Sequence, residues 1–212
     1  MASRRLLKYL RYYSSRVPGK AVFREGWNNA FGKHLLFTNT WTSGVLMIGG
    51  DIMEQEIEYQ RGVISKRYDW SRVGRMFLTG LLFGPLHHYF YGWMDRVLPK
   101  RNMGSVTKKI LLDQFIMSPA CIACFIYSMG ALERKPLKSS TDELKDKFAE
   151  VYLVDWCIWP PTQFINFYFL PVKYQVLYIN AVTMVYNVFL SYIKHRDMTP
   201  VAAPISSDVI PQ

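Results

Sequence analysis

The apolar stretch from Val151 to Lys194 constrains the fold of this chain more than any other feature of its sequence. Its second half, Tyr174 to Ile193, contains 20 residues without a charge. Because an α-helix rises about 1.5 Å per residue, a helix of this length crosses the roughly 30 Å hydrocarbon layer of a bilayer. This half of the stretch therefore predicts a membrane-spanning helix.

Prolines interrupt the first half of the stretch, although it is also apolar and aromatic. Pro160, Pro161 and Pro171 lack the N–H that helix interiors use, and their rings clash with the preceding turn. We therefore expect residues 151–170 to form a broken, tilted or re-entrant segment whose freed backbone groups find partners within the protein. If this segment is helical, one of its faces carries indole and amide groups, from Trp156, Trp159, Gln163 and Asn166.

Three earlier apolar segments predict three further spans, at Leu35–Ile52, Phe77–Val97 and Ile110–Leu132. In the second of these, Gly80 and Gly84 are spaced so that a neighbouring helix can approach closely. Proline residues predict a kink after Gly84, at Pro85, and a break in the third span, at Pro119.

The expected fold class is therefore all-α: a polytopic integral membrane helix bundle of about four transmembrane helices, with a proline-broken or re-entrant segment before the last. We expect three regions along the chain. A basic arm covers residues 1–33, the transmembrane helical domain covers residues 34–194, and a disordered tail covers residues 195–212.

The N-terminal arm is strongly basic. Residues 1–33 contain eight Lys or Arg residues and a single acid, Glu25, and leucines recur between the charges at helical spacing. This composition is typical of a mitochondrial targeting segment. An alternative, compatible with the first, is an uncleaved arm that lies on an anionic membrane surface.

The distribution of charge between the connecting segments predicts an orientation. With four crossings, the arm, the connection from Asp95 to Lys109 and the tail share one side, with 15 Lys and Arg and a net charge of +11. The opposite side has 10 Lys and Arg and a net charge of +1. The positive-inside rule then puts both termini on the positive side, which is the matrix in a mitochondrial inner membrane. A fifth crossing by residues 151–170 would move the C-terminus to the other side.

Few ionisable side chains interrupt the apolar segments. Asp51, Asp113 and Asp155 are expected either to anchor salt bridges to Arg75, Arg96 or Lys109, or to line a polar path through the bundle. His88 is expected to be a hydrogen-bonded neutral imidazole between helices, with a functional role as the alternative.

The sequence lacks the usual signatures of catalysis and metal binding. It contains no phosphate-binding glycine loop and no metalloprotease or hydrolase motif. Its three cysteines, Cys121, Cys124 and Cys157, have no metal-ligand or disulfide-framework spacing and are expected to be buried packing residues. We therefore expect no enzyme, no metal and no cofactor.

Several of these residues together resemble a known family. The sequence between Leu35 and Lys194 contains Gly49-Gly50-Asp51 with Gln55, then Gly84-Pro85, Asp113-Gln114 and the block Trp156-x-x-Trp159-Pro160-x-x-Gln163-x-x-Asn166. This pattern resembles the family of Mpv17 and the 22-kilodalton peroxisomal membrane protein. The resemblance implies the following packing or pore residues: Gly50, Asp51, Gln55, Gly84, Pro85, His88, Asp113, Gln114, Asp155, Trp156, Trp159, Pro160, Gln163 and Asn166.

Within that family, the segments Lys108–Gln114 and Asp155–Pro160 look most like a mitochondrial subgroup, the Mpv17-like proteins. This likeness implies an inner-membrane protein linked to assembly of the mitochondrial ribosome and to translation. Other family members are described as pores for small solutes, which is the alternative function. The chain departs from the family pattern at Tyr174-Gln175, where an arginine is common, and at Tyr186, where a tryptophan is common.

The expected partners follow from the resemblance and the charge. They are the lipid bilayer, the large subunit of the mitochondrial ribosome through protein and ribosomal RNA surfaces, and a possible second copy of the chain, with no role for DNA. The basic residues expected to face the partner are Arg4, Arg5, Lys8, Arg11, Arg96, Lys100, Arg101, Lys108 and Lys109.

Overall fold

The structure, a computed structural model, describes the backbone of residues 18–195 and the side-chain environment of residues 22–186. Four of the basic residues singled out in the arm, Arg4, Arg5, Lys8 and Arg11, lie outside the described residues, as do residues 196–212 of the tail.

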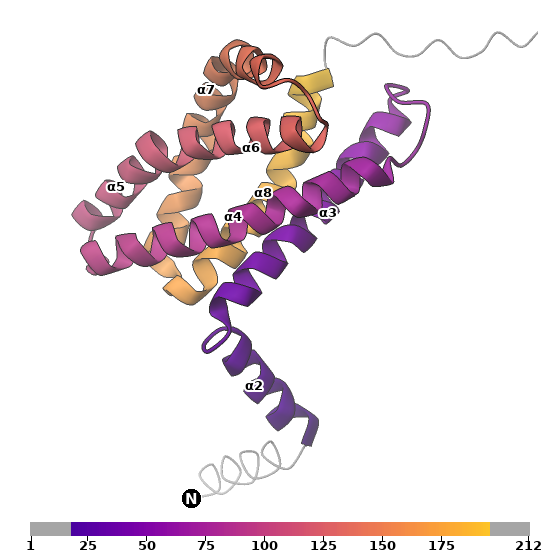
Figure 1. Cartoon of the computed structure of the whole chain (residues 1–212). Coiled ribbons are helices and arrows are strands. Elements are labelled where there is room, and N and C mark those ends of the chain that lie inside the picture. The colour runs from indigo at the N-terminus through magenta and orange to yellow at the C-terminus, as the bar shows by residue number, and fades with distance from the viewer. Residues whose placement is uncertain (1–17, 196–212) are drawn as a thin grey trace, which may run out of the picture.

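The described residues form helices and no strand, which confirms the all-α fold class (Figure 1). The elements in chain order are α2 (Pro18–Ala30), α3 (Leu35–Gln60), α4 (Trp70–Val97), α5 (Met103–Leu112), the π-helical turn η1 (Asp113–Met117), α6 (Ser118–Leu132), α7 (Leu137–Phe169) and α8 (Val172–His195). α2 projects from one end of the bundle, and the other elements pack against one another.

The chain runs through the bundle five times, along α3, α4, the α5–η1–α6 stretch, α7 and α8 (Figure 1). α3 and α8 are parallel, because Phe31 before α3 contacts Tyr174 near the start of α8, and Ser43 further along α3 bonds to Asn180. The described end of α8 therefore lies at the opposite end of the bundle from α2. This differs from the arrangement of four crossings with both termini at one end.

The expected break in residues 151–170 is wrong for most of that segment. α7 continues from Leu137 to Phe169 through Pro160 and Pro161. Each proline removes only one helical hydrogen bond, and packing on neighbouring helices outweighs that loss. The helix ends instead at Leu170, which precedes Pro171 and has extended backbone angles (φ −95°, ψ 137°), as steric clash with the following proline ring favours.

Pro119 widens the helix rather than ending it. The helical turn just before it, Asp113–Met117, is a π-turn, in which the N–H of Ser118 bonds to the carbonyl of Asp113, five residues back. The wider turn accommodates a proline without interrupting the helical stretch from Met103 to Leu132. π-turns of this kind occur often at functional sites.

Small residues bring α3 and α4 into close contact, as the glycine spacing predicts. A Cβ atom added to Gly84 would lie 2.4 Å from the Thr40 Cα, and one added to Gly80 would lie 2.8 Å from the Gly44 Cα. Only a residue without a side chain fits at such an approach. These glycines fix the spacing of the helices that carry Asp51, Arg72 and Tyr91.

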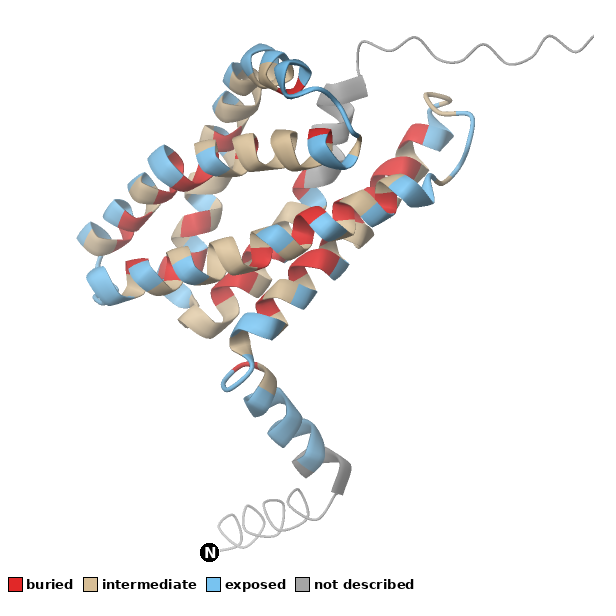
Figure 2. Cartoon of the chain, in the orientation of Figure 1, coloured by how far each residue is buried: buried red, intermediate tan, exposed pale blue. Residues whose placement is uncertain are grey.

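Buried residues lie along the helices where they pack together (Figure 2). Many of them are polar, beside an apolar cluster, and the surface is rich in apolar side chains. Buried side chains include Asn39, Asp51, Gln114 and Gln163, each 0 or 1% exposed, whereas large apolar side chains on several helices are exposed. By length and composition, one helical stretch within the described residues, Met103–Leu132, is long and apolar enough to cross a membrane. The buried polar residues lower the hydropathy of the other long helices.

Candidate functional site

A cavity of about 430 Å³ runs through the bundle interior, between α3, α4, η1, α6, α7 and α8. Its walls are mostly apolar and include Met76, Met117, Ile122, Phe125 and Ile179. Polar side chains enter at three places, which we call the Arg72 cluster (Asp51, Glu54, Glu58 and Arg72), the Asp113 cluster (Tyr91, Asp113, Gln163 and Asn166) and the Asp155 cluster (Ser118, Asp155, Trp159 and Tyr186).

The Arg72 cluster joins the end of α3 to the start of α4. Its guanidinium lies 2.7 Å from Asp51, 2.5 Å from Glu54 and 2.8 Å from Glu58, with all three carboxylates on one face of α3. Burial opposes the charge on Arg72, but the three carboxylates more than offset it, so the pKa of Arg72 lies above its ordinary value. The expected anchoring role is therefore confirmed for Asp51, although the partner is Arg72 rather than Arg75, Arg96 or Lys109.

Gln55 fixes the connection between these two helices. Its Nε2 donates to Asp51 at 2.8 Å, and its Oε1 accepts from the backbone N–H of Asp69 at 2.5 Å. The Asp69 carboxylate in turn accepts from the backbone N–H groups of Ser71 and Arg72 and so caps α4. Gly50, just before Asp51, is also buried.

The Asp113 cluster lies deeper in the bundle. Nε2 of Gln163 donates to the Tyr91 hydroxyl at 2.8 Å and to the Asp113 carboxyl at 2.9 Å, and Nδ2 of Asn166 donates to Oε1 of Gln163 at 2.9 Å. The other carboxyl oxygen of Asp113 has no hydrogen-bond partner. Both amide atoms of the fully buried Gln114 also lack one.

In the Asp155 cluster, three neutral donors satisfy one carboxyl group. Ser118 donates to it at 2.6 Å, Trp159 at 3.0 Å and Tyr186 at 2.6 Å. No cation of the described residues pairs with Asp155 or Asp113, so the expected salt bridges are wrong for both residues. The reason is that Lys109 reaches Asp95 instead, at 3.0 Å.

The histidines lie between helices, as expected for His88. Nδ1 of His88 lies 3.0 Å from Nδ2 of Asn39 on α3. His87 lines the cavity, with its Nδ1 3.0 Å from the Phe83 carbonyl and its Nε2 3.8 Å from Cys121. Cys157 is exposed and Cys121 and Cys124 are half-buried, so the expectation that all three cysteines are buried is wrong.

Only three of the four side chains predicted to share one helix face, Trp156, Trp159, Gln163 and Asn166, do so. The last three point into the polar interior, whereas Trp156 packs edge-on against Phe115 at 5.4 Å between ring centroids. Pro85 and Pro160 are partly exposed within their helices.

Among the described basic residues proposed to face a partner, four are exposed: Arg96, Lys100, Arg101 and Lys108. Lys109 is 2% exposed, pairs with Asp95 and lies 5.8 Å above the Phe167 ring, so its assignment to the partner surface is wrong. An amphipathic stem and a nearby carboxylate explain the burial.

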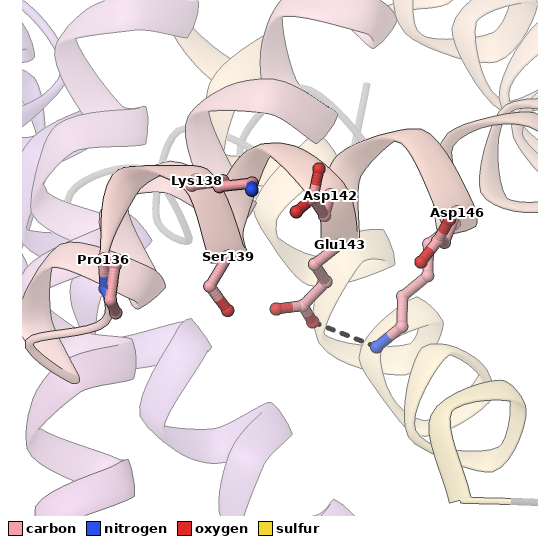
Figure 3. Close-up of a pocket in the computed structure, with 7 residues that line it drawn as sticks. Pro136, Lys138, Ser139, Asp142, Glu143 and Asp146 are labelled. Carbon is pink, nitrogen blue, oxygen red and sulfur yellow. Dashed lines mark hydrogen bonds and ion pairs between the residues drawn. The ribbon is translucent and has the colours of Figure 1, made fainter.

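A second hollow lies on the surface beside the first turns of α7 (Figure 3). It is lined by Pro136, Lys138, Ser139, Asp142, Glu143, Asp146 and Lys147, and Glu143 and Lys147 pair across it at 3.0 Å. The hollow contains both acidic and basic side chains, and within the described residues no group of three or more His, Cys, Asp and Glu side chains could hold a metal ion.

Sequence reasoning missed six residues of these clusters: Glu54, Glu58, Arg72, Tyr91, Ser118 and Tyr186. Arg72 follows a helix-capping aspartate, but Arg61, Lys66 and Arg67 lie nearer in the sequence to the three acids, so the sequence alone does not select it. Ser118 and the two tyrosines have no comparable signal, because their polar atoms meet Asp155 or Asp113 only through the packing of different helices.

An all-helical bundle with buried polar clusters and an exposed apolar surface defines the class: an α-helical membrane protein. Comparison with known proteins supports the assignment to the α-helical membrane proteins. The model of the Mpv17 / PMP22 family matches residues 130–191. Protein sym1 of Aspergillus oryzae is 30% identical over 78% of this chain and 94% of its own length. Peroxisomal membrane protein 2 of Bos taurus is 31% identical over 74% of this chain and 81% of its own length.

Mitochondrial inner membrane protein Mpv17 of Homo sapiens is 29% identical over 80% of this chain and 96% of its own length. No solved structure matches. The chain belongs to the Mpv17 / PMP22 family, and the resemblance of its motifs to that family is confirmed.

Proposed function

We propose that this protein is a polytopic protein of the mitochondrial inner membrane that supports assembly of the mitochondrial ribosome and translation. The bundle presents one basic end to the large ribosomal subunit. The name of the relative Mpv17 supports the inner-membrane location, and the distribution of charge between the two ends of the bundle supports an RNA-rich partner.

The exposed apolar side chains support several membrane crossings. Leu78 and Leu82 on α4, Phe115 on η1 and Leu153 and Ile165 on α7 are between 45 and 68% exposed. Surfaces of this kind are stable against lipid but costly in water. The polar side chains between the helices find partners within the bundle, which lowers the cost of crossing.

The two ends of the bundle differ in charge. The described part of the α2 end comprises residues 18–34, 95–109 and 170–173, and it contains nine Lys and Arg and two acids. Residues 53–75 and 133–150 form the opposite end and contain ten Lys and Arg and nine acids. Unpaired cationic side chains near phosphate release counterions, so the α2 end favours ribosomal RNA and anionic lipid.

The test compares two triple variants for co-sedimentation of the solubilised protein with the large mitochondrial ribosomal subunit. Replacing the exposed Lys100, Arg101 and Lys108 by Gln should lower co-sedimentation and flatten its salt dependence. Replacing Arg134, Lys138 and Lys145, which are exposed at the opposite end, is the matched control and should change neither. Equal co-sedimentation of all three proteins, each correctly inserted, would exclude electrostatic docking by this end.

A second candidate function is passage of small solutes, which the interior cavity favours. Its volume of about 430 Å³ lies within the range of small-molecule sites, and three polar clusters line it. The purified protein in planar bilayers should then show a conductance that changes in the Asp113→Asn variant. A silent bilayer with folded protein would argue against this function.

A further inference from the structure

Several hydrogen-bond donors that line the interior cavity are already in use. Both hydrogens of the Gln163 amide are donated, and Asn180 donates to Ser43 at 2.6 Å. Ser118, Trp159 and Tyr186 all donate to Asp155. Because a carbonyl only accepts, the bond to Phe83 assigns the His87 proton to Nδ1 and leaves Nε2 as an acceptor facing Cys121.

An acceptor, in contrast, remains open. Asp113 is 4% exposed and lines the cavity, and its Oδ1 has no hydrogen-bond partner. An unpaired buried carboxyl oxygen costs free energy that a donor would recover. A molecule that enters this cavity therefore gains most if it brings a hydrogen-bond donor with it.

The charges that line the cavity also favour a ligand that carries a positive charge. Asp113 and Asp155 are near enough to interact electrostatically, and neither has a cationic partner among the described residues. The basic side chains that line the cavity, Arg72, Lys135 and Lys147, pair with acids in or near the Arg72 cluster and the α6–α7 connection. The Asp113 end of the cavity is therefore the part that lacks positive charge.

The remaining walls are apolar and polarisable. Met117, Ile122, Phe125, Ile126 and Met129 line the stretch along η1 and α6. Thioether and aromatic side chains suit an apolar body and adapt to its shape, and an aromatic face also attracts a cation. The volume of about 430 Å³ accepts a molecule of modest size.

We propose that the cavity is a binding site for a small organic cation with an apolar body and at least one N–H donor, whose ammonium group bonds to the open oxygen of Asp113. Gln163 donates to the other oxygen of that carboxyl group at 2.9 Å and so orients it. The site shares its cavity with the solute-passage function proposed above and names the class of molecule for which the cavity is suited.

Three probes with the same aromatic body separate the contributions of charge, N–H donors and apolar contact to the binding affinity. Phenethylamine carries charge and N–H donors, its trimethylammonium analogue carries charge without donors, and ethylbenzene carries neither. Calorimetry on the full chain in detergent should give phenethylamine an affinity about tenfold or more above both analogues, because a charge-assisted hydrogen bond is strong in a dry site. Equal affinities for all three would overturn the proposal, since apolar partition would then explain binding.

Two variants test the named residue. Asp113→Asn should reduce the affinity for phenethylamine about tenfold and bring it to that of the analogues. Asp142→Asn, at an exposed acid outside this cavity, is the matched control and should leave it unchanged. Retention of the full affinity in Asp113→Asn would show that the open oxygen binds water only, and would overturn the site.

A measurement on the natural sequence covers the case in which Asp113→Asn does not fold. Cys121 lines the cavity, whereas Cys157 is exposed and does not line it. Phenethylamine should slow alkylation of Cys121 by a small maleimide and leave Cys157 unaffected. A Cys121 that reacts equally with and without the amine would overturn the proposal.

The planar-bilayer recording distinguishes the amine-binding site from the solute-passage function. Selective binding in a protein that conducts nothing would leave the site standing and exclude the pore. A conductance without preference for the amine would leave the pore standing and exclude the site.

Discussion

At the scale of residues, one partly buried arginine, Arg72, pairs with three buried carboxylates. Arg72 lies within ion-pair distance of Asp51, Glu54 and Glu58. Its side chain is 20% exposed, and those of the acids are at most 8% exposed. Because an unpaired buried charge costs several kcal/mol, this arginine is expected to decide whether α3 and α4 can pack at this end.

Replacing Arg72 by Met should therefore destabilise the protein by about 3–5 kcal/mol, because three buried carboxylates lose their counter-charge. Unfolding of the detergent-solubilised protein by denaturant titration would measure this loss. Arg67→Met is the control, since the side chain of Arg67 is 58% exposed and water screens its ion pair with Glu56, so its loss should be far smaller. A loss for Arg72→Met no larger than that of the control would contradict the role given to this cluster.

Glu56 predicts a pH dependence at the same end. Hydrogen bonds from Arg67, Tyr68 and Gln60 lower the pKa of Glu56 from 4.5 to about 2. Because the folded pKa is below the unfolded one, the stabilising contribution is complete above about pH 4.5 and is lost as the pH falls toward 2. The melting temperature of the natural protein should exceed that of Glu56→Gln at pH 7, and the difference should shrink below pH 4.5.

The control for this pH series is Asp142→Asn, which removes an exposed acid outside the Glu56 contacts and should leave the melting curves unchanged. A difference between the natural protein and Glu56→Gln that stays constant from pH 7 to pH 3 would contradict the pKa assigned to Glu56.

At the scale of elements, close backbone contacts and local turns determine how the helices pack, more than the spacing of apolar residues does. α3 and α4 pack through glycines, and the α5–η1–α6 stretch brings Asp113 inward through a π-turn. Proline acts differently at each position: α7 continues through Pro160 and Pro161 and ends only before Pro171. Helix packing thus decides which prolines end a helix.

Gly84→Ala should destabilise the bundle by about 1–3 kcal/mol, because the added methyl group would lie 2.4 Å from the Thr40 Cα and force the two helices apart. Gly92→Ala in the same helix is the matched control. Nothing lies within 4 Å of its new Cβ, and the helix propensity of alanine should raise stability by up to about 1 kcal/mol. Thermal unfolding in detergent compares the two, and equal effects would contradict close packing at Gly84.

At the scale of the whole molecule, five passages through the bundle put the α2 end and the end of α8 on opposite sides. In mitochondria, we expect an N-terminal tag to be protected in the matrix and a C-terminal tag to face the intermembrane space, because the α2 end is the more basic one. Protease digestion after rupture of the outer membrane tests this. Protection of both tags would instead support an even number of crossings.

Much of this protein follows from its sequence. Long apolar segments require helices, because lipid offers no partner to a free backbone group, and glycine spacing predicted the close α3–α4 contact. The motif residues Asp51, Gln55, Asp113 and Gln163 were singled out before the structure placed them in polar clusters.

Only the tertiary structure decided the partners of those residues and the number of passages. Arg72 lies beside Asp51 because two helices meet end to end at a capped turn, and Tyr186 reaches Asp155 across 31 positions in the chain. α7 remains helical because its packing outweighs two lost hydrogen bonds, which no local propensity records. Local chemistry thus determined which segments are helical, and long-range packing determined which side chains meet and at which end of the bundle the last helix finishes.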